Sequence, residues 1–470
     1  MANKTPQVHI YDDLHPEDGA MLQALYSRSP ASVVDHVAKV KEVGSGKFMS
    51  QYYVGYGHAS IGDCGTTNVF IENFSMLAAK AIQDNPLYSG QEASTRYLDF
   101  SVQPMKDPYA HPASKKILDE WMDIYNKYLA KAIEALKLRH PFSESEYKKE
   151  RIWENAIKAR GFDTLRGFLP LGTTTLLSWS SNLRQIRDRL MLIKNHPLAE
   201  VRDMAKVIFD QIVKNYPNSF NGEELGDNVR YAASDAWQAK FAVRDHYLRA
   251  EDLVKQFKLS PLEIDKMIAG GIILRRDTIN IEKMNELEAE LLASRPKWAN
   301  LPRRLESYGT YNLMFLLDFG SYRDLQRHRN GICQIPLTDG KFGMFPWYMN
   351  ELKGLLPDDY GDIVERTHAQ FERIKNLKSE GVESDDLQDQ YLYPMGTSIM
   401  CQLTYSVPQM VYVSELRSQK TVHASLRPIA QLMGEILAER HPGMALYIDK
   451  DPDTFSEKRG TQTISDQAVA

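Results

Sequence analysis

Cysteine is scarce in this sequence, and long apolar runs are absent. The three cysteines, Cys64, Cys333 and Cys401, lie far apart without Cys-x-x-Cys spacing. This pattern excludes a disulfide framework and a zinc site of the usual spacing, and we expect no bound metal ion. No run of 18 apolar residues occurs, and the N-terminus lacks the apolar stretch of a signal peptide. We therefore expect a cytoplasmic protein that does not contact a membrane.

A surplus of basic residues is also missing. The 62 acidic side chains outnumber the 57 basic ones and give a formal net charge of −5. Proteins that bind duplex nucleic acid draw most of their affinity from neutralised phosphates, so we expect no large nucleic acid as a partner. The Gly44–Lys47 stretch fails as the phosphate loop of nucleoside triphosphatases, because Lys41 replaces the first glycine and Phe48 replaces the Ser or Thr, so we expect no nucleoside triphosphate hydrolysis.

The composition is that of a globular protein. The 470 residues are 43% hydrophobic and 25% charged, which suits two or three domains. Apolar residues recur with helical spacing in five segments, and two runs of β-branched and aromatic residues indicate strands. The expected helices are 113–138, 188–216, 278–293, 362–379 and 421–439, and the expected strands are 66–74 and 311–319. We predict an α+β fold with mixed sheets and long helices.

The order of features repeats along the chain. Each half contains a strand that runs into a helix, and later a short segment with proline, glycine and threonine in register, Leu169–Thr175 in the first half and Tyr393–Ile399 in the second. We interpret this as a tandem duplication. The expected domains are residues 1–230 and 231–450, with a linker at or just beyond 218–228. The polar tail 451–470 is expected to be loosely ordered and without function.

The loop Tyr88–Tyr97 concentrates groups that bind anions. Ser94 and Thr95 offer hydroxyl groups, Arg96 offers a fork of donors, and Glu92 offers an acceptor. This combination suits a phosphate with a polar ring beside it. The alternative is an ordinary helix-capping box, because Ser89 and Glu92 have the required spacing.

Two further basic groups follow apolar segments. Arg327, His328 and Arg329 stand at the end of an expected helix and should splay toward more than one anionic partner. The alternative is that they only complement the helix dipole. Arg417 precedes His423 and Arg427, whose i,i+4 spacing would set them on one helix face, and surface ion pairing is the alternative there.

These motifs resemble the flavin-dependent thymidylate synthases, whose signature combines an Arg-His-Arg triplet, a serine-rich loop ending in Arg-Tyr, and an upstream Gly-His. The first half has the Gly-His element with Ser60 and the loop with Arg96, and it has the family's later elements as Arg166 and as Asn182 with Arg184. Its triplet, however, has become Asp84-Asn85-Pro86.

The second half is the complement of the first. It keeps the triplet, as Arg327 to Arg329, and the late helix arginine, as Arg417. Its loop carries Ile335, Leu337 and Asp339 at the signature positions, and its Asn-x-Arg element has become Ser406–Pro408. No element has lost both copies. Because the family builds each site between subunits, the resemblance implies one composite site from two specialised halves, and a homodimer that forms a pseudo-tetramer.

The resemblance implies an enzyme in which reduced FAD carries a one-carbon unit from methylenetetrahydrofolate to C5 of dUMP or a related pyrimidine mononucleotide, with NADPH reducing the flavin. One alternative is a catalytically lapsed flavin- and nucleotide-binding regulatory protein of the same fold. Another is a structural scaffold with chance motifs. No enzyme nucleophile is required, which agrees with cysteines that lack an activating basic context.

The resemblance also implies roles for individual residues. Substrate binding is expected from Glu92, Ser94, Thr95, Arg96, Arg166, Asp324, Arg327 and Arg417, with Arg417 and Arg327 as catalytic residues. Flavin binding is expected from Ser60, Glu92, Asn182, Arg184, Arg327, His328 and Arg329. Asp324 stands where the family has glutamine, so a 4-amino pyrimidine or a modified uridylate stays open as substrate. The alternative for Asp324 is simple pairing with Arg323 or Arg327.

Overall fold

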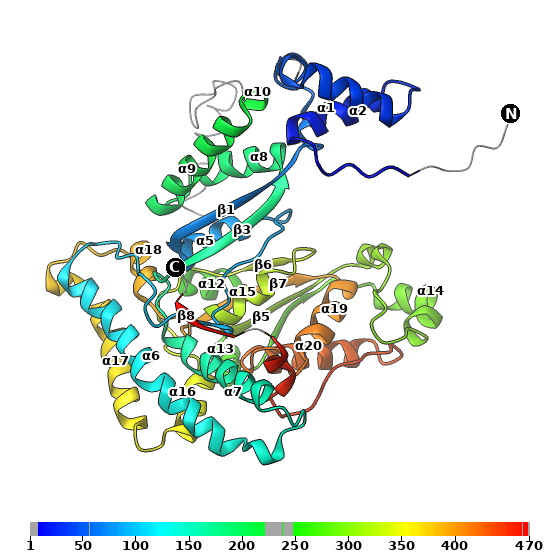
Figure 1. Ribbon diagram of the computed structural model, residues 1–470. Helices are drawn as coiled ribbons and strands as arrows, with labels where there is room; N and C mark the ends of the chain where they lie inside the picture. Colours follow the sequence, from blue (N-terminus) through cyan, green and yellow to red (C-terminus); the bar gives the residue numbers. More distant parts are fainter. Residues whose placement is uncertain (1–7, 56, 221–236, 238–247, 463, 469–470) are drawn as a thin grey trace. The chain divides into compact units, whose positions relative to one another are not determined.

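The computed structural model (Figure 1) describes residues 8–55, 57–220, 237, 248–462 and 464–468. It confirms the α+β class, since long helices accompany small sheets. No helix in these ranges is both long and apolar enough to cross a membrane. The expected linker at 218–228 falls mostly outside the described residues, and the division into halves at residue 230 stays a prediction.

The chain forms two compact units that each draw on separate stretches of sequence. Unit 1 comprises Met1–Glu72, Leu87–Glu92 and Leu177–Asp245, and unit 2 comprises Asn73–Pro86, Ala93–Leu176 and His246–Ala470. Unit 2 therefore combines segments from both halves of the sequence. Two strands, β1 (Thr66–Ser75) and β3 (Thr174–Asn182), have residues in both units and pair with each other.

Unit 1 is mainly helical. Its helices are α1 (Pro16–Tyr26), α2 (Val33–Val43), α3 (Gly46–Phe48), the π-helical η1 (Met49–Gly55), α4 (Ala59–Gly62), α8 (Leu183–Ile193), α9 (Ala199–Asn215) and α10 (Pro217–Phe220). The apolar faces of α1 and α2 pack together through Met21, Leu22, Val37 and Val40. The buried carboxylate of Glu17 accepts hydrogen bonds from the backbone N–H and the hydroxyl of Ser219, both at 2.7 Å, which ties α10 to α1.

Unit 2 is built on a four-stranded sheet in the order β4-β5-β7-β6, with antiparallel neighbours. Its strands are β4 (Ile273–Asp277), β5 (Tyr311–Asp318), β6 (Ile332–Gln334) and β7 (Ser398–Tyr405), and a separate pair joins β2 (Leu98–Asp99) to β8 (Ser465–Ala468). The central strands β5 and β7 are almost continuously buried, which explains their long apolar runs. The predicted strands 66–74 and 311–319 are confirmed as β1 and β5.

Helices cover the sheet of unit 2 and flank it. They are α5 (Met76–Gln83), α6 (Pro112–Arg139), α7 (Glu150–Leu165), α12 (Ala250–Phe257), α13 (Pro261–Ile268), α14 (Ile281–Ala293), α15 (Phe319–Gln326), α16 (Pro346–Leu355), α17 (Tyr360–Lys375), α18 (Asp386–Asp389), α19 (Val407–Arg417) and α20 (Arg427–Arg440). Short 3₁₀ turns are η2 (Phe142–Glu144), η3 (Arg166–Phe168), η4 (Arg303–Tyr308), η5 (Leu377–Glu380), η6 (Gln390–Leu392) and η7 (Glu457–Thr461). Figure 1 shows α6 and α17 side by side, joined by ion pairs such as Lys131–Asp359 at 2.7 Å.

The two proline-glycine segments of the sequence repeat pair with each other inside unit 2. Pro170 and Pro394 form an antiparallel bridge. On either side of it, the Leu171 N–H donates to the Tyr393 carbonyl at 2.9 Å, and the Met395 N–H donates to the Leu169 carbonyl at 2.8 Å. The two prolines thus lie opposite each other, and the two hydrogen bonds beside them are equivalent, since Leu171 matches Met395 and Leu169 matches Tyr393 in the two segments. The same turn follows each proline, closed at 2.9 Å by the N–H of Thr173 and of Thr397.

Three sequence predictions about local structure are wrong. The helix expected over 188–216 is interrupted between α8 and α9, where Pro197 cannot donate a helical hydrogen bond. The helix expected over 421–439 begins only at Arg427, so His423 lies in the preceding loop and shares no helix face with Arg427. No helix begins at Ser89, which instead forms a bridge with Ser180, so the capping-box alternative also fails.

The polar tail is ordered as far as it is described without a break, which corrects the expectation of loose order. Arg427 donates to the backbone carbonyls of Asp451, at 2.8 Å, and Asp453. The Phe455 ring stacks on His140 with centroids 4.0 Å apart. Sequence reasoning missed this because a segment of few apolar residues can still be held by charged side chains that lie far away in the sequence.

The close packing around the paired segments Leu169–Thr175 and Tyr393–Ile399 leaves no room for a side chain at Gly172. A Cβ there would lie 2.5 Å from the backbone oxygen of Lys106 and 3.0 Å from that of Tyr391. We expect Gly172→Ala to lower the unfolding free energy by about 1–3 kcal/mol, since backbone atoms cannot move aside as a flexible side chain can. The control is Gly361→Ala on α17, which has open space around it and should be neutral or slightly stabilising. Equal urea midpoints for the two variants would contradict the close approach.

Candidate functional site

The buried carboxylate of Asp324, on α15, contacts two arginines and lies in the electrostatic field of two more. Its Oδ1 lies 3.4 Å from Arg327 Nη1 and 3.7 Å from Arg417 Nη1. Burial alone would raise the pKa of the Asp324 carboxyl, but Arg417, Arg327, Arg96 and Arg166 together hold that pKa below its usual range. Four arginines that sequence analysis expected to bind the nucleotide therefore act on one carboxylate, Arg327 and Arg417 by contact and Arg96 and Arg166 through their charge.

Arg417 ends α19 and is fixed by two directional hydrogen bonds. Its Nη2 donates to the backbone oxygen of Asp324 at 2.7 Å, and its Nε donates to Nε2 of His328 at 2.8 Å. His328 must therefore accept at Nε2, which puts the proton of the neutral ring on Nδ1. Burial and the neighbouring Arg417 lower the pKa of His328 to about 3. His328 thus orients Arg417 and carries no charge at neutral pH.

The other two members of the Arg-His-Arg triplet point to different partners. The Arg327 side chain is 47% exposed and is paired with Asp324. Arg329 donates to the backbone oxygen of Arg327 at 3.1 Å. The three side chains make different contacts, but only two of them are cations, and their binding to more than one anionic partner stays a prediction. Interaction with the helix dipole alone would not require the ion pair of Arg327 or the hydrogen bond that His328 accepts.

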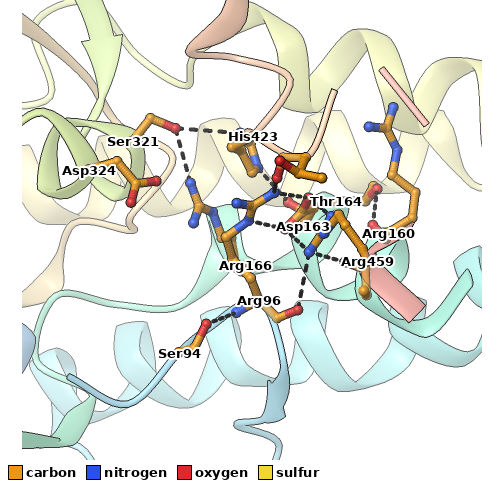
Figure 2. A network of polar contacts seen from close by, with 12 residues as sticks. Ser94, Arg96, Arg160, Asp163, Thr164, Arg166, Ser321, Asp324, His423 and Arg459 are labelled. Atoms are coloured by element: carbon orange, nitrogen blue, oxygen red, sulfur yellow. Dashed lines mark hydrogen bonds and ion pairs between the residues drawn. The ribbon is translucent and has the colours of Figure 1, made fainter. Parts of the chain in front are cut away.

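Arg96 is held by a second buried carboxylate, Asp163 on α7 (Figure 2). Its Nε and Nη2 donate to the two oxygens of Asp163 at 2.8 and 2.9 Å, and Nη2 also reaches the Thr421 backbone oxygen at 3.2 Å. Arg459 from the tail pairs with the same carboxylate. Burial alone would raise the pKa of Asp163, but Arg459 and Arg96 hold it well below its usual range. The Asp163 carboxylate is therefore ionised and shared.

Arg166 lies deeper, at the start of η3. Its Nη2 donates to the Ser321 hydroxyl at 3.0 Å, and its guanidinium lies 3.7 Å from the buried Asp318. His423 is close by, with Nδ1 2.8 Å from the Ser425 hydroxyl (Figure 2 shows this ring beside Arg166). Burial and then Arg166 keep the pKa of His423 well below its usual range. Arg166 can therefore act on a ligand through its field, while its own donors face the interior.

The arginine cluster, defined here as Arg96, Arg166, Arg327, Arg417 and Arg459, faces the aspartates Asp163, Asp318 and Asp324. Because both histidines are neutral, five positive charges meet three negative ones. Exposure falls from 47% for the Arg327 side chain to 15% for Arg417 and 14% for Arg96. An anion would therefore approach from the side of Arg327, and the surplus charge would match a phosphate dianion.

The remaining loop residues divide between the units. The Ser94 hydroxyl accepts from the Arg96 backbone N–H at 3.3 Å, and Thr95 is buried, so both lie beside the cluster in unit 2. Glu92 belongs to unit 1, where it forms a bridge with Leu177. The structure therefore gathers Arg96, Arg166, Asp324, Arg327 and Arg417 with Ser94, and leaves Glu92 outside this group.

The expected flavin-binding residues fall in both units. In unit 1, Arg184 Nε donates to Asp63 at 2.6 Å, which joins the Gly-His element to the Asn-x-Arg element. Asn182 uses its side-chain oxygen to cap α8 through the Gln185 N–H at 2.9 Å, and Ser60 is exposed. His328, Arg329 and Arg327 belong to unit 2. The two elements predicted in the first half are thus brought together within unit 1.

Sequence reasoning missed Asp163, Asp318 and Arg459. Asp163 stands three residues before Arg166 on the same helical segment, and this spacing next to a candidate site residue was a usable signal. Asp318 caps α15 by accepting from the Ser321 N–H at 2.9 Å, which also follows from its position between strand and helix. Arg459 carries no local signal. Within the described residues, no group of side chains could hold a metal ion.

Comparison with known proteins gives two findings. Residues 18–218 match the family described as thymidylate synthase complementing protein (Thy1). Over most of its length the chain is similar to UPF0159 proteins: it is 26% identical to one from Chlamydia muridarum, covering 84% of this chain and 78% of the relative, and 24% identical to one from Chlamydia pneumoniae, covering 83% and 78%. A UPF0159 protein of Thermoplasma acidophilum is 23% identical over 91% of this chain and 94% of its own.

The shared carboxylate of Asp163 should make the fold sensitive to acid. Its pKa is depressed in the folded state, so its stabilisation is complete above the unfolded-state pKa of about 4 and is lost as the pH falls through that value toward the folded pKa. We expect Asp163→Asn to lower the unfolding free energy at pH 7 by about 3–5 kcal/mol, because two buried arginines lose their partner, and to lose less further stability than the wild type between about pH 5 and 3.

Urea titrations at several pH values measure this effect. The control is Asp119→Asn, which removes an exposed i,i+4 pair with Lys115 and should change stability by less than about 0.5 kcal/mol. Parallel pH profiles for wild type and Asp163→Asn would contradict the ionised, shared carboxylate.

Proposed function

We propose that this chain is a flavin-dependent enzyme similar to thymidylate synthase, which transfers a one-carbon unit from methylenetetrahydrofolate to C5 of dUMP or a related pyrimidine mononucleotide. The observation that carries the proposal is the grouping of arginines at Asp324, which Arg327 and Arg417 contact at 3.4 and 3.7 Å and whose pKa Arg96 and Arg166 also help to lower. These four arginines are the ones that the family resemblance assigns to nucleotide binding, and they come from both halves of the chain. The match of residues 18–218 to the thymidylate synthase complementing family supports the same reaction class.

The proposal includes a tandem duplication whose halves have specialised. Its support is the bridge between Pro170 and Pro394, which two equivalent hydrogen bonds flank, one from each segment. The junctions between strand and helix are also alike in the two halves. The side chains of Ser75 and Asp318 cap α5 and α15 at equivalent positions. Each half then supplies the motifs that the other has lost. A homodimer of such chains, in the cytoplasm, would carry four family-like halves.

The nucleotide phosphate is assigned to the exposed side of the arginine cluster. A dianion needs several charged donors in one place, and the cluster has two more positive than negative charges. Arg327 and Arg96 would bind the phosphate, with Ser94 as a hydroxyl donor and Arg166 adding charge from behind. The carboxylate of Asp324 keeps these groups together without neutralising all of them.

Arg417 is assigned to the pyrimidine ring. Its guanidinium is oriented by His328 and by the Asp324 backbone before any ligand arrives. Preoriented donors stabilise charge that develops in a transition state without reorganising. Arg417 would therefore stabilise negative charge on the ring oxygens as C5 becomes nucleophilic.

The donor chemistry suits a flavin nucleotide, although its candidate residues fall in both units. The exposed hydroxyl of Ser60 and the guanidinium groups of Arg184 and Arg329 are groups that hold phosphates. When bound, a reduced flavin would supply the electrons and transfer the one-carbon unit, with NADPH as its reductant. The protein supplies no thiolate: burial raises the pKa of the thiols of Cys64, Cys333 and Cys401. A reaction whose covalent chemistry belongs to the cofactor fits this chain.

A second candidate function is nucleotide and flavin binding without turnover. The observation that favours it is the saturation of Arg96, whose Nε and Nη2 both donate to Asp163. A site with occupied donors can bind weakly and catalyse nothing. Asp324 in place of the family's glutamine points in the same direction.

One assay separates the two functions. The purified protein is examined for flavin absorption and then for NADPH oxidation with methylenetetrahydrofolate, with and without dUMP, dCMP and UMP. The enzyme proposal expects bound flavin and oxidation that depends on one of these nucleotides. Bound flavin without nucleotide-dependent turnover would replace it with the binding function, and binding of neither flavin nor nucleotide would contradict both.

Arg417→Lys tests the role given to this arginine. Lysine keeps the charge but cannot make both directional bonds to His328 and the Asp324 carbonyl. We expect nucleotide affinity to change by less than about tenfold and kcat to fall by about 10²–10³-fold, the cost of removing one preoriented donor. The control is Arg303→Lys, whose side chain is 92% exposed and whose kinetics should match the wild type. A fall in affinity with an unchanged kcat would contradict this role and assign Arg417 to binding alone.

A further inference from the structure

Arg459 brings a charge from the C-terminal segment into the arginine cluster. It belongs to the short turn η7 (Glu457–Thr461), and its guanidinium pairs with both oxygens of Asp163. Its Nη2 also lies 3.3 Å from the backbone oxygen of Arg96 and 3.4 Å from that of Ala159 (Figure 2). The side chain is 6% exposed. Arg459 is thus linked to Arg96 in two ways: it contacts the backbone oxygen of Arg96, and it shares the Asp163 carboxylate that binds the Arg96 side chain.

Other contacts already hold the segment on the protein. Lys420 pairs with Asp451 at 2.6 Å, Phe455 stacks on His140, and the Glu457 carboxylate accepts from the Ser145 hydroxyl at 2.7 Å. A buried guanidinium is costly to desolvate and is a poor device for attachment alone. The neighbouring Arg96 also repels the Arg459 guanidinium. Burial, and then the charge of Arg96, lower the pKa of Arg459. Attachment of the tail does not account for this arrangement.

Charge accounts for it. Without Arg459, the carboxylate of Asp163 would serve Arg96 alone, and the pair would be neutral. With Arg459 present, the three groups carry one positive charge, and Arg96 is held in a fixed orientation by a carboxylate that is only partly its own. When two guanidinium groups share one carboxylate, the charge of each is less fully neutralised than in a simple ion pair. The field at the partly exposed Arg96 therefore stays positive.

We propose that Arg459 is a positioning residue of the anion site, which keeps Arg96 oriented and positively charged toward a substrate phosphate by sharing Asp163 with it. This inference rests on the proposed nucleotide function for the identity of the phosphate, but not for the existence of an anion site. It also assigns a role to the tail, which sequence composition had suggested to be without one.

The test compares Arg459→Gln, Arg459→Lys and the control Lys458→Ala in the full-length protein. Lys458 is the neighbouring residue of η7 and is exposed, so its loss removes one charge from the same segment outside the cluster. Calorimetry measures the dissociation constants of inorganic phosphate and of dUMP at low and at physiological salt, about 0.15 M. Thermal unfolding of each variant reports the fold.

We expect Arg459→Gln to raise both dissociation constants by about tenfold at low salt, a change that corresponds to about 1.4 kcal/mol, and to weaken their dependence on salt. Arg459→Lys should recover most of the affinity, because it restores the charge. Lys458→Ala should bind like the wild type. Rescue by lysine and the altered salt dependence are signatures that a merely structural role would not produce.

Dissociation constants within twofold of wild type for a folded Arg459→Gln would overturn the inference. Equal losses of affinity and of thermal stability in Arg459→Gln and Arg459→Lys would overturn it as well, since the role would then be attachment. Wild-type binding of phosphate but of no pyrimidine nucleotide would reject the proposed function and leave the role of Arg459 intact. Wild-type binding of neither ligand would reject the anion site itself.

Discussion

The pairing of a few buried aspartates with a larger number of arginines is the constraint on which unit 2 depends. Two guanidinium groups about 4 Å apart repel by about 4 kcal/mol at an effective dielectric constant of 20, so a cluster of this kind needs anions inside it. Asp163 and Asp324 supply them, each on a helix that also fixes its position, α7 and α15. Long-range connections follow from this requirement. The loop at Arg96, the end of α19 and the C-terminal segment all meet at these two carboxylates.

The same constraint connects structure to function. Charges that are gathered but not fully neutralised make a site for an anion, whereas complete pairing would make a structural network only. The exposure of the side chains distinguishes an anion site from a structural network. The side chain of Arg327 is exposed, those of Arg417 and Arg96 are partly exposed, and those of Arg166 and Arg459 are buried. The graded access gives the cluster one approachable side. The neutral His328 contributes by orienting Arg417 rather than by carrying charge.

The sequence was informative where local chemistry decides the structure. The strands β1 and β5 and the helix α6 were predictable, because the spacing of apolar residues within each segment reflects which of its side chains are buried. The motifs around Arg96 and Arg327 could be picked out because each gathers anion-binding side chains within one short segment, and their joint action in one composite site stays a prediction. Sequence analysis failed at His423, where a stretch with helical spacing is a loop that ends at α20. A tertiary contact of the ring with the backbone oxygen of Asp163 holds it there. Sequence analysis failed most clearly at Arg459, because nothing in a polar tail reveals a partner, Asp163, that lies about three hundred residues earlier.

The most direct test of the central claim is a crystal structure of the protein with dUMP bound. The account predicts the phosphate within hydrogen-bond distance, about 3 Å, of the guanidinium of Arg327 or Arg96, with the pyrimidine ring toward Arg417 and with the Asp163 and Asp324 pairs intact. A phosphate bound elsewhere, for example beside Arg295 and Trp298 in the hollow between the 295–301 loop and α19, with the arginine cluster untouched, would contradict it.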